Sequence, residues 1–200
     1  MSEFVKPSEN SAAEWVPTRR SLLLGALGVA GLGAGAAVVE HYWKKKDMTA
    51  RLFNPFSIEK FDLAPVPGLA FADGRAVPGF SSADFQDKRV ILNLWASYCP
   101  TCQAEHHLLM ALAARKLAPI YGADVKDRPE HARAFLARRG NPFVAVGADD
   151  QSFLQRALGA RGVPATFVIG PGPKVEVSIL GPLEPEIIET QIVPALMKRA

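Results

Sequence analysis

Cysteine is scarce in this chain, and its scarcity excludes most structural uses of the residue. The 200 residues contain two cysteines, Cys99 and Cys102, so none is left over for a second, structural disulfide. A structural zinc site needs four ligands, and no second cluster of cysteine or histidine supplies the missing two. A disulfide that closes so short a loop adds little stability by the chain-entropy argument. The pair is therefore interpreted as a reactive dithiol.

A strong charge of one sign is also lacking. The formal net charge is +3 and the basic residues are scattered along the chain, so the sequence gives no indication of nucleic-acid binding. A length of 200 residues with 48% hydrophobic content fits one globular domain with an appendage. We divide the chain into a polar tail (1–20), an apolar segment (21–39), a basic linker (40–60) and a globular domain (61–200).

The apolar segment at 21–39 carries no charge and is built from Leu, Ala, Val and Gly after a single Ser. A helix of this length spans roughly 28 Å, about the thickness of the hydrocarbon core of a bilayer. Arg19 and Arg20 stand directly before it, in a context that resembles a twin-arginine export signal. Two interpretations follow: a retained transmembrane anchor, or a signal cleaved near the small residues at 34–36.

The flanking charges give a conflicting indication of topology. Two arginines directly precede the apolar segment, whereas four basic residues follow it between positions 44 and 51. Counting positive residues alone therefore places the globular domain in the cytoplasm. The twin-arginine pattern favours export instead. We expect export, with the domain in the periplasm. The four basic residues at 44–51 are Lys44, Lys45, Lys46 and Arg51.

The two cysteines lie in the motif WASYCPTC at 95–102. The apolar run at 90–94 before it predicts a buried strand, and 103–117 after it predicts a helix. A strand that delivers Cys-x-x-Cys to a helix N-terminus is the thioredoxin arrangement. Free backbone N–H groups and the helix dipole stabilise a thiolate at that position. We expect Cys99 to attack a partner disulfide and Cys102 to resolve the mixed disulfide.

The remaining pattern completes an α/β thioredoxin fold, a central mixed sheet flanked by helices. Prolines within 61–68 indicate an edge strand followed by turns, and 81–85 resembles a short capped helix. The last helix contains Pro194, which predicts a bend or break there. Further strands are expected at 119–125, 143–146, 166–169 and 175–180, and further helices at 129–139, 151–158 and 185–196.

Several separated stretches resemble the membrane-anchored thiol–disulfide reductases of cytochrome c biogenesis, the CcmG/DsbE family. The resemblance runs from about Phe61 to Leu196, and the stretches after the cysteines are more specific than Cys-x-x-Cys itself. Two positions depart from the family: Tyr98 replaces the usual Trp, and Ala165 replaces the Glu that usually follows the active-site proline. The stretches are 93–102 with 104–106, 126–130, 140–143, 162–164 with 166–167, and 181–183.

The resemblance implies roles for five further residues. Pro164 matches a cis-proline packed against the dithiol, which presents the backbone of Val163 to an extended substrate. Tyr98 and Trp95 are expected to contact the substrate. Glu105 matches an acidic position that accepts a proton from Cys102; the alternative is a solvated helix glutamate. The neighbouring His106 is interpreted as structural.

The expected function is reduction of periplasmic disulfides during cytochrome c maturation, with no bound cofactor because the dithiol is the redox centre. The resemblance implies apocytochrome c or a haem-ligation thiol protein as partner, and a membrane thiol transporter as electron source. One alternative is a broader periplasmic disulfide reductase. The other is a copper chaperone with the cysteines as soft ligands, although no histidine follows His131 to complete such a site.

Overall fold

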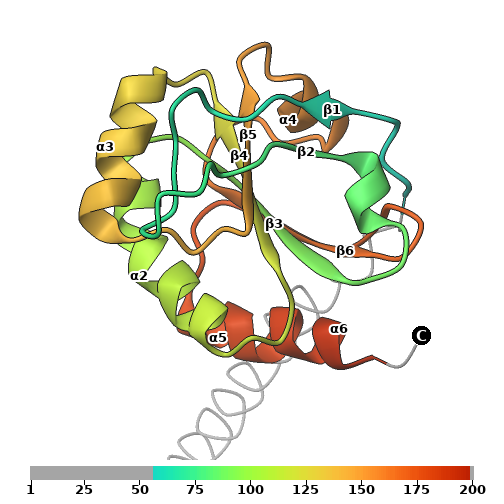
Figure 1. Ribbon diagram of the computed structural model, residues 1–200. Coiled ribbons are helices and arrows are strands. Elements are labelled where there is room, and N and C mark those ends of the chain that lie inside the picture. Colours follow the sequence, from blue (N-terminus) through green and yellow to red (C-terminus); the bar gives the residue numbers. More distant parts are fainter. Residues whose placement is uncertain (1–55, 199–200) are drawn as a thin grey trace, which may run out of the picture. The chain divides into compact units, whose positions relative to one another are not determined.

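The domain is built on one five-stranded mixed sheet. The computed structural model describes residues 56–198 (Figure 1). The strands lie in the order β5-β4-β3-β6-β7, with β3, β4 and β5 parallel to one another and β6 and β7 antiparallel to their neighbours. The predicted thioredoxin fold is confirmed. The strands are β3 (Val90–Trp95), β4 (Ile120–Val125), β5 (Ala145–Asp149), β6 (Ala165–Gly170) and β7 (Lys174–Leu180).

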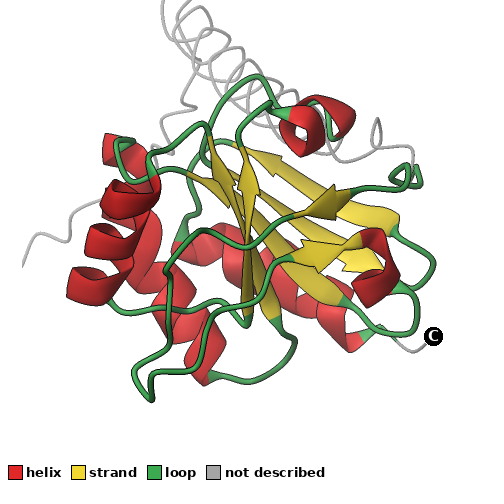
Figure 2. Ribbon diagram, turned by 45° about the horizontal axis from the view of Figure 1, so that its top comes forward, coloured by secondary structure: helices red, strands yellow, loops and turns green. Residues whose placement is uncertain are grey.

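Helices cover one face of this sheet, and a mixture of short elements covers the other (Figures 1 and 2). On the first face α2 (Pro100–Ala114), α3 (Pro129–Arg139) and the C-terminal helical segment pack into one apolar cluster. On the second face a separate cluster joins the remaining elements to the sheet. These are β1 (Asp62–Leu63), β2 (Phe80–Ser81), the short 3-10 helix η1 (Ser82–Phe85) and α4 (Phe153–Ala157).

The strand β3 lies at the centre of the sheet and is buried along its whole length. Its side chains alternate between the two clusters: Ile91 and Trp95 enter the helical one, whereas Leu92 and Leu94 enter the other. A strand covered on both faces has an almost continuous apolar sequence, because neither set of side chains meets water. The apolar run at 90–94 therefore predicted this strand correctly, and the motif follows directly from its end.

Several element boundaries differ from the expected ones. The helix α2 begins at Pro100 rather than at residue 103, because Pro is favourable at the first helical position and Cys99 acts as the N-cap. The same helix ends at Ala114, before Lys116 takes a left-handed conformation with φ 53°. The last helical segment contains α5 (Pro185–Ile187), a π-helical turn η2 (Ile188–Ile192) and α6 (Val193–Met197). The irregularity thus directly precedes Pro194.

The described domain begins before the expected boundary at residue 61. The N–H of Ile58 donates to Pro173 at 2.9 Å, and Phe56 accepts from Val175 at 2.8 Å. Ile58 is itself buried. Residues 56–60, assigned above to the linker, therefore extend the packing beside β7. The apolar segment at 21–39 lies outside the described residues, and within 56–198 no helix is long and apolar enough to cross a membrane.

Candidate active site

The two cysteines form a disulfide at the start of α2. Cys99 is the N-cap residue and Cys102 lies within the first helical turn, with 5.2 Å between their Cα atoms. Both are largely covered, with 6% of Cys99 and 3% of Cys102 exposed. The more exposed cysteine is the one expected to attack. The structure therefore places the dithiol where the sequence predicted it, between β3 and a helix N-terminus.

One backbone donor of this first turn points at the sulfur of Cys99. The N–H of Cys102 donates to the Cys99 Sγ at 3.1 Å, which is the capping contact of the helix. The first N–H groups of a helix have no intrahelical acceptor, and together with the helix dipole they favour negative charge. After reduction, the same donor faces the Cys99 thiolate and lowers the cost of forming it. The local geometry thus suits Cys99 for nucleophilic attack.

The loop before β6 lies against the dithiol. The bond between Val163 and Pro164 is cis, as predicted. The Cys99 Sγ lies 3.6 Å from the carbonyl oxygen of Val163, so the two segments touch although 64 residues separate them in sequence. Pro164 is buried, and Ala165 directly after it begins β6 at 1% exposure. The side chain at the position of the family's usual Glu is therefore a small apolar one inside the sheet.

Glu105 is buried on α2, one turn after Cys102, with 3% of the residue exposed. Its Oε2 accepts from the N–H of Leu183 at 2.7 Å, and its Oε1 accepts from the Asn93 Nδ2 at 3.4 Å. The alternative of a solvated glutamate is wrong. Burial raises the pKa of Glu105, and the two hydrogen bonds oppose that rise. A carboxyl that holds its proton more readily than usual therefore lies close to the second cysteine in sequence.

Trp95 and His106 belong to the core below the site. Trp95 is 2% exposed and stacks on Phe143 with ring centroids 5.6 Å apart, while its Nε1 has no hydrogen-bond partner among the described residues. A direct contact between Trp95 and a substrate is therefore not supported, since its neighbours cover it. The His106 Nε2 hydrogen-bonds to the carbonyl oxygen of Gly140 at 3.0 Å, and its ring meets Phe135 edge-on. The structural role expected for His106 is confirmed.

Tyr98 is the exposed aromatic residue of the motif, with 57% of its surface accessible. Its hydroxyl donates to the carbonyl oxygen of Val125 at 3.3 Å, which ties the active-site loop to the end of β4. Partial burial raises the pKa of Tyr98, and the charges of Asp127 and Asp124 raise it further. Tyr98 therefore presents a ring beside Cys99 while its hydroxyl stays neutral at physiological pH.

Two carboxyl groups below this loop were not singled out from the sequence. Asp124 is 3% exposed near the end of β4, and Asp127 lies three residues further along. The Asp127 Oδ2 accepts from the N–H of Ser97 at 2.5 Å. Burial is the largest cause that raises the pKa of Asp124 to about 8, followed by the charge of Asp127. The sequence did contain one signal for this buried carboxyl, because Asp124 is a charged residue inside the otherwise apolar strand predicted at 119–125.

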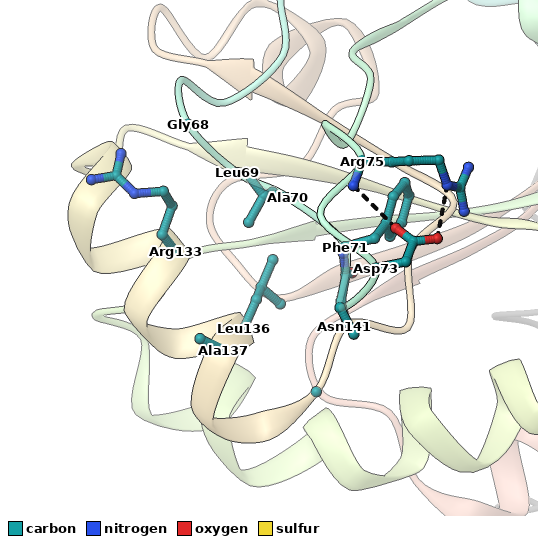
Figure 3. A pocket seen from close by; sticks show the side chains of 12 residues that line it. Gly68, Leu69, Ala70, Phe71, Asp73, Arg75, Arg133, Leu136, Ala137 and Asn141 are labelled. Atoms are coloured by element: carbon teal, nitrogen blue, oxygen red, sulfur yellow. Dashed lines mark hydrogen bonds and ion pairs between the residues drawn. The ribbon is translucent and has the colours of Figure 1, made fainter.

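Two cavities of the domain differ in whether predicted site residues line them. A cavity of about 780 Å³ lies between the 68–75 segment and α3, and none of the predicted site residues lines it (Figure 3). Asp73 and Arg75 line that cavity and form an ion pair with each other. A smaller cavity of about 340 Å³ is lined by Val163 and Pro164 together with Leu180. Of these two cavities, the second is lined by the cis-proline segment that contacts Cys99.

The chain matches the family model described as Redoxin over residues 72–192. Among curated proteins, it is 36% identical over 137 residues to the probable thiol:disulfide interchange protein DsbE-2 of Pasteurella multocida, covering 62% of this chain and 72% of that protein. It is 36% identical over 118 residues to HelX of Rhodobacter capsulatus, covering 58% and 66%. It is 38% identical over 120 residues to DsbE of Escherichia coli, covering 58% and 64%.

Solved structures of similar proteins share the fold. DsbF from MTB superposes with a TM-score of 0.56 at 23% identity, covering 68% of this chain and 95% of that structure. A thiol:disulfide interchange protein DsbE from Chlorobium tepidum superposes with a TM-score of 0.56 at 24% identity, covering 72% and 99%. Family model, sequence relatives and dithiol geometry agree: this chain belongs to the Redoxin family and, within it, to the DsbE-type thiol:disulfide interchange proteins.

Proposed function

We propose that this thiol:disulfide oxidoreductase works as a reductant in cytochrome c maturation, keeping the haem-binding cysteines of apocytochrome c reduced. It would act on the apocytochrome directly or on a haem-ligation thiol protein. The observation that carries the chemistry is the Cys99–Cys102 pair at the N-terminus of α2, beside the cis Val163–Pro164 bond. The similarity to DsbE and HelX supports the choice of pathway.

The exchange proceeds in two displacements. The Cys99 thiolate attacks one sulfur of the partner disulfide, so that a mixed disulfide forms and the other partner sulfur leaves as a thiolate. The Cys102 thiolate then attacks the Cys99 sulfur, which releases the second partner thiolate and closes the Cys99–Cys102 disulfide. Two electrons pass to the partner, whose thiolates take up two protons. The dithiol is the whole redox centre, and we propose that no bound cofactor is needed.

Glu105 is proposed as the group that accepts the proton of Cys102 before the second displacement. It follows Cys102 by three residues on the same helix, which places the two side chains on neighbouring parts of its surface. Its raised pKa supports this role, because a base works best when its pKa lies near the working pH. The hydrogen bond from the Leu183 N–H holds the carboxylate in place when the proton has left.

The surface around Val163 is proposed to bind an extended segment of the partner. The cavity of about 340 Å³ lies beside Val163, and Leu180 at its edge is 61% exposed. Tyr98, directly before Cys99 in the sequence, adds an exposed aromatic ring. An open apolar surface with a reactive sulfur suits a polypeptide substrate, since the backbone of the partner can lie along residues 162–163.

We propose that the domain faces the periplasm and that the segment at 21–39 anchors it to the inner membrane. The resemblance to membrane-anchored relatives and the arginine pair before the segment support export. Electrons would then come from a membrane thiol transporter. A periplasm-only reporter fused after Ala200 should be active. A reporter active only in the cytoplasm would contradict the location and the proposed pathway together.

Covalent trapping tests the proposed partners. In Cys102→Ser the mixed disulfide on Cys99 has no resolving thiol, so partners should accumulate as covalent adducts. Cys99→Ser, which keeps Cys102 but lacks the attacking thiol, is the matched control and should trap far less. An apocytochrome or a haem-ligation protein among the adducts supports the proposal. Adducts with unrelated envelope proteins alone would instead favour a broader reductase.

Two further measurements address direction and pathway. The reduction potential, obtained by equilibration with glutathione, should be reducing; a value as oxidising as about −120 mV, typical of a dedicated oxidase, would contradict a reductant. Deletion of the gene should remove c-type cytochromes from a haem stain. Complementation should succeed with the natural chain and fail with Cys99→Ser. Normal cytochromes in the deletion strain would argue against the pathway but not against the exchange chemistry.

A further inference from the structure

Two arginines without a charged partner lie in cavities near the dithiol, and the first is Arg161. This residue is exposed and lines the cavity of about 340 Å³ together with Val163 and Pro164. The carbonyl oxygen of Val163 lies 3.6 Å from the Cys99 sulfur, so the loop that lines this cavity also contacts the reactive atom. Within residues 56–198, no hydrogen bond or ion pair joins the Arg161 side chain to another residue.

The second arginine is Arg139, the last residue of α3. It is exposed and lines a cavity of about 650 Å³ together with Pro100, which directly follows Cys99 and begins α2. Burial is the main cause that lowers the pKa of His106, and the charge of Arg139 lowers it further. The guanidinium therefore acts on the first turns of α2. In the part of the chain that the structure describes, its side chain also has no ion-pair partner.

Neither of these two cavities is lined by an aspartate or a glutamate. The carboxyl of Glu105 on α2 is 3% exposed, and its two oxygens accept hydrogen bonds from Leu183 and Asn93. At the end of β4, Asp127 accepts from the N–H of Ser97 at 2.5 Å and lines neither cavity. The two cavities on either side of the Cys99 sequence position thus each contain one arginine and no carboxylate that neutralises it.

We propose that Arg161 and Arg139 select partner segments that carry a carboxylate within a few residues of the reactive cysteine. The inference rests on the thiol–disulfide exchange proposed above and adds the charge of the substrate to it. An extended segment whose cysteine meets Cys99 continues over the loop of Val163 in one direction and over Pro100 in the other. A guanidinium binds a carboxylate there through two parallel N–H donors.

The expected selectivity is modest for each arginine, because both side chains are exposed. Ion pairs at exposed positions typically change an equilibrium or a rate about threefold. Two such pairs that act independently multiply, so together they should favour an acidic segment over a neutral one about tenfold. A basic segment meets repulsion at both positions and is disfavoured. The selectivity should also weaken with salt, since the Debye length is about 3 Å at 1 M.

The test measures exchange of the reduced full chain with disulfide-linked dimers of the peptide acetyl-Xaa-Gly-Cys-Gly-Xaa-amide at pH 7. Xaa is Asp in the acidic probe, Asn in the neutral probe and Lys in the basic probe, so the cysteine environment is otherwise the same. The quantity compared is the ratio of the rate constants for the acidic and neutral probes. Within one chain this ratio is independent of the thiolate fraction of Cys99, and between chains the intrinsic reactivities of the peptides cancel.

Arg161→Gln and Arg139→Gln should each lower this ratio about threefold, and the double variant about tenfold. Arg161→Lys keeps the positive charge and should retain most of the preference. Arg156→Gln is the matched control, because it removes the same charge from exposed α4 surface and lines neither cavity. In 1 M salt the difference between the natural chain and the double variant should shrink to less than about twofold.

The outcomes separate this inference from the activity on which it rests. A natural chain that reacts with none of the three probes would contradict the exchange chemistry itself. A reactive chain whose ratio is the same in the natural form and in the double variant would overturn the selectivity. An equal loss in Arg156→Gln would assign the effect to net charge and overturn the role of the two cavities. A ratio that responds to one substitution alone would overturn the role of the other arginine.

Discussion

Replacing Asp124 by asparagine should remove a pH-dependent loss of stability that the buried carboxyl imposes on the fold. The ordinary pKa of this group is 3.8, and burial next to Asp127 raises it to about 8. Between these two values the folded chain keeps a proton that the unfolded chain has released. The free energy of unfolding therefore decreases as pH rises through this window, and the decrease ends above the folded-state pKa.

The expected size follows from the linkage of proton binding to folding. Each pH unit inside the window changes the free energy of unfolding by about 1.4 kcal/mol for one group. From pH 5 to pH 7 the natural chain should therefore lose about 3 kcal/mol that Asp124→Asn keeps. For a domain of this size that difference corresponds to roughly 10 °C in Tm. The charge of Asp127 contributes to the raised pKa of Asp124, so the slope also depends on that neighbouring carboxylate.

Urea unfolding of the oxidised full chain at pH 5, 6 and 7, followed by far-UV circular dichroism, measures this difference. The quantity of interest is the pH dependence of the gap between the two chains, because the substitution also changes packing by a constant amount. Glu130→Gln is the control, since that carboxylate is exposed and should leave the slope unchanged. A gap that stays constant within about 0.5 kcal/mol, well below the linkage value, would show that Asp124 is ionised in the fold.

Three more outcomes are expected. Glu105→Gln should prolong the lifetime of the mixed disulfide at pH 7 about a hundredfold, the usual loss when a general base is removed, in a chase of a trapped complex; an unchanged lifetime would assign Glu105 to structure alone. Gly122→Ala should cost about 1–3 kcal/mol in urea unfolding, because the added Cβ would lie 2.9 Å from atoms of both Phe143 and Trp95. Gly162→Ala, where nothing lies within 4 Å, is its control. Alkylation of the reduced chain should modify Cys99 before Cys102 at neutral pH, and the reverse order would exchange their roles.

The features that could be predicted from the sequence are those determined by residues close together in the chain. The strand β3 is apolar throughout because both of its faces are covered, and the dithiol follows it without a gap. The N-terminus of α2 was placed three residues too late. The signal for the correct start was present, since Pro100 suits the first helical turn and a cysteine before it can accept a backbone hydrogen bond. Local chemistry alone is therefore sufficient to place the start of α2 at Pro100.

The burial of Glu105 and of Trp95 depends on partners far away in the sequence. Glu105 is held by Leu183, which lies 78 residues further along, so no helical pattern within α2 reports that contact. Trp95 is covered by Phe143 and Phe135 from the segment around α3. Sequence spacing indicates which side of an element a residue occupies, but the fold decides whether that side meets solvent. The roles of both residues were therefore ambiguous before the structure.

Two buried acids, Glu105 on α2 and Asp124 on β4, lie on segments near the dithiol. Their surroundings differ, and so do the protonation states that these surroundings favour. Glu105 lies on the helix that contains Cys102 and accepts hydrogen bonds from a backbone N–H and an amide, so it can carry a negative charge there. Asp124 lies near the end of β4, where burial and the charge of Asp127 favour its protonated form. One group can therefore release and regain a proton near the resolving cysteine, while the other keeps its proton at neutral pH. Burial raises the pKa of both groups. Hydrogen-bond donors around Glu105 oppose that rise, whereas the negative charge of Asp127 adds to it for Asp124.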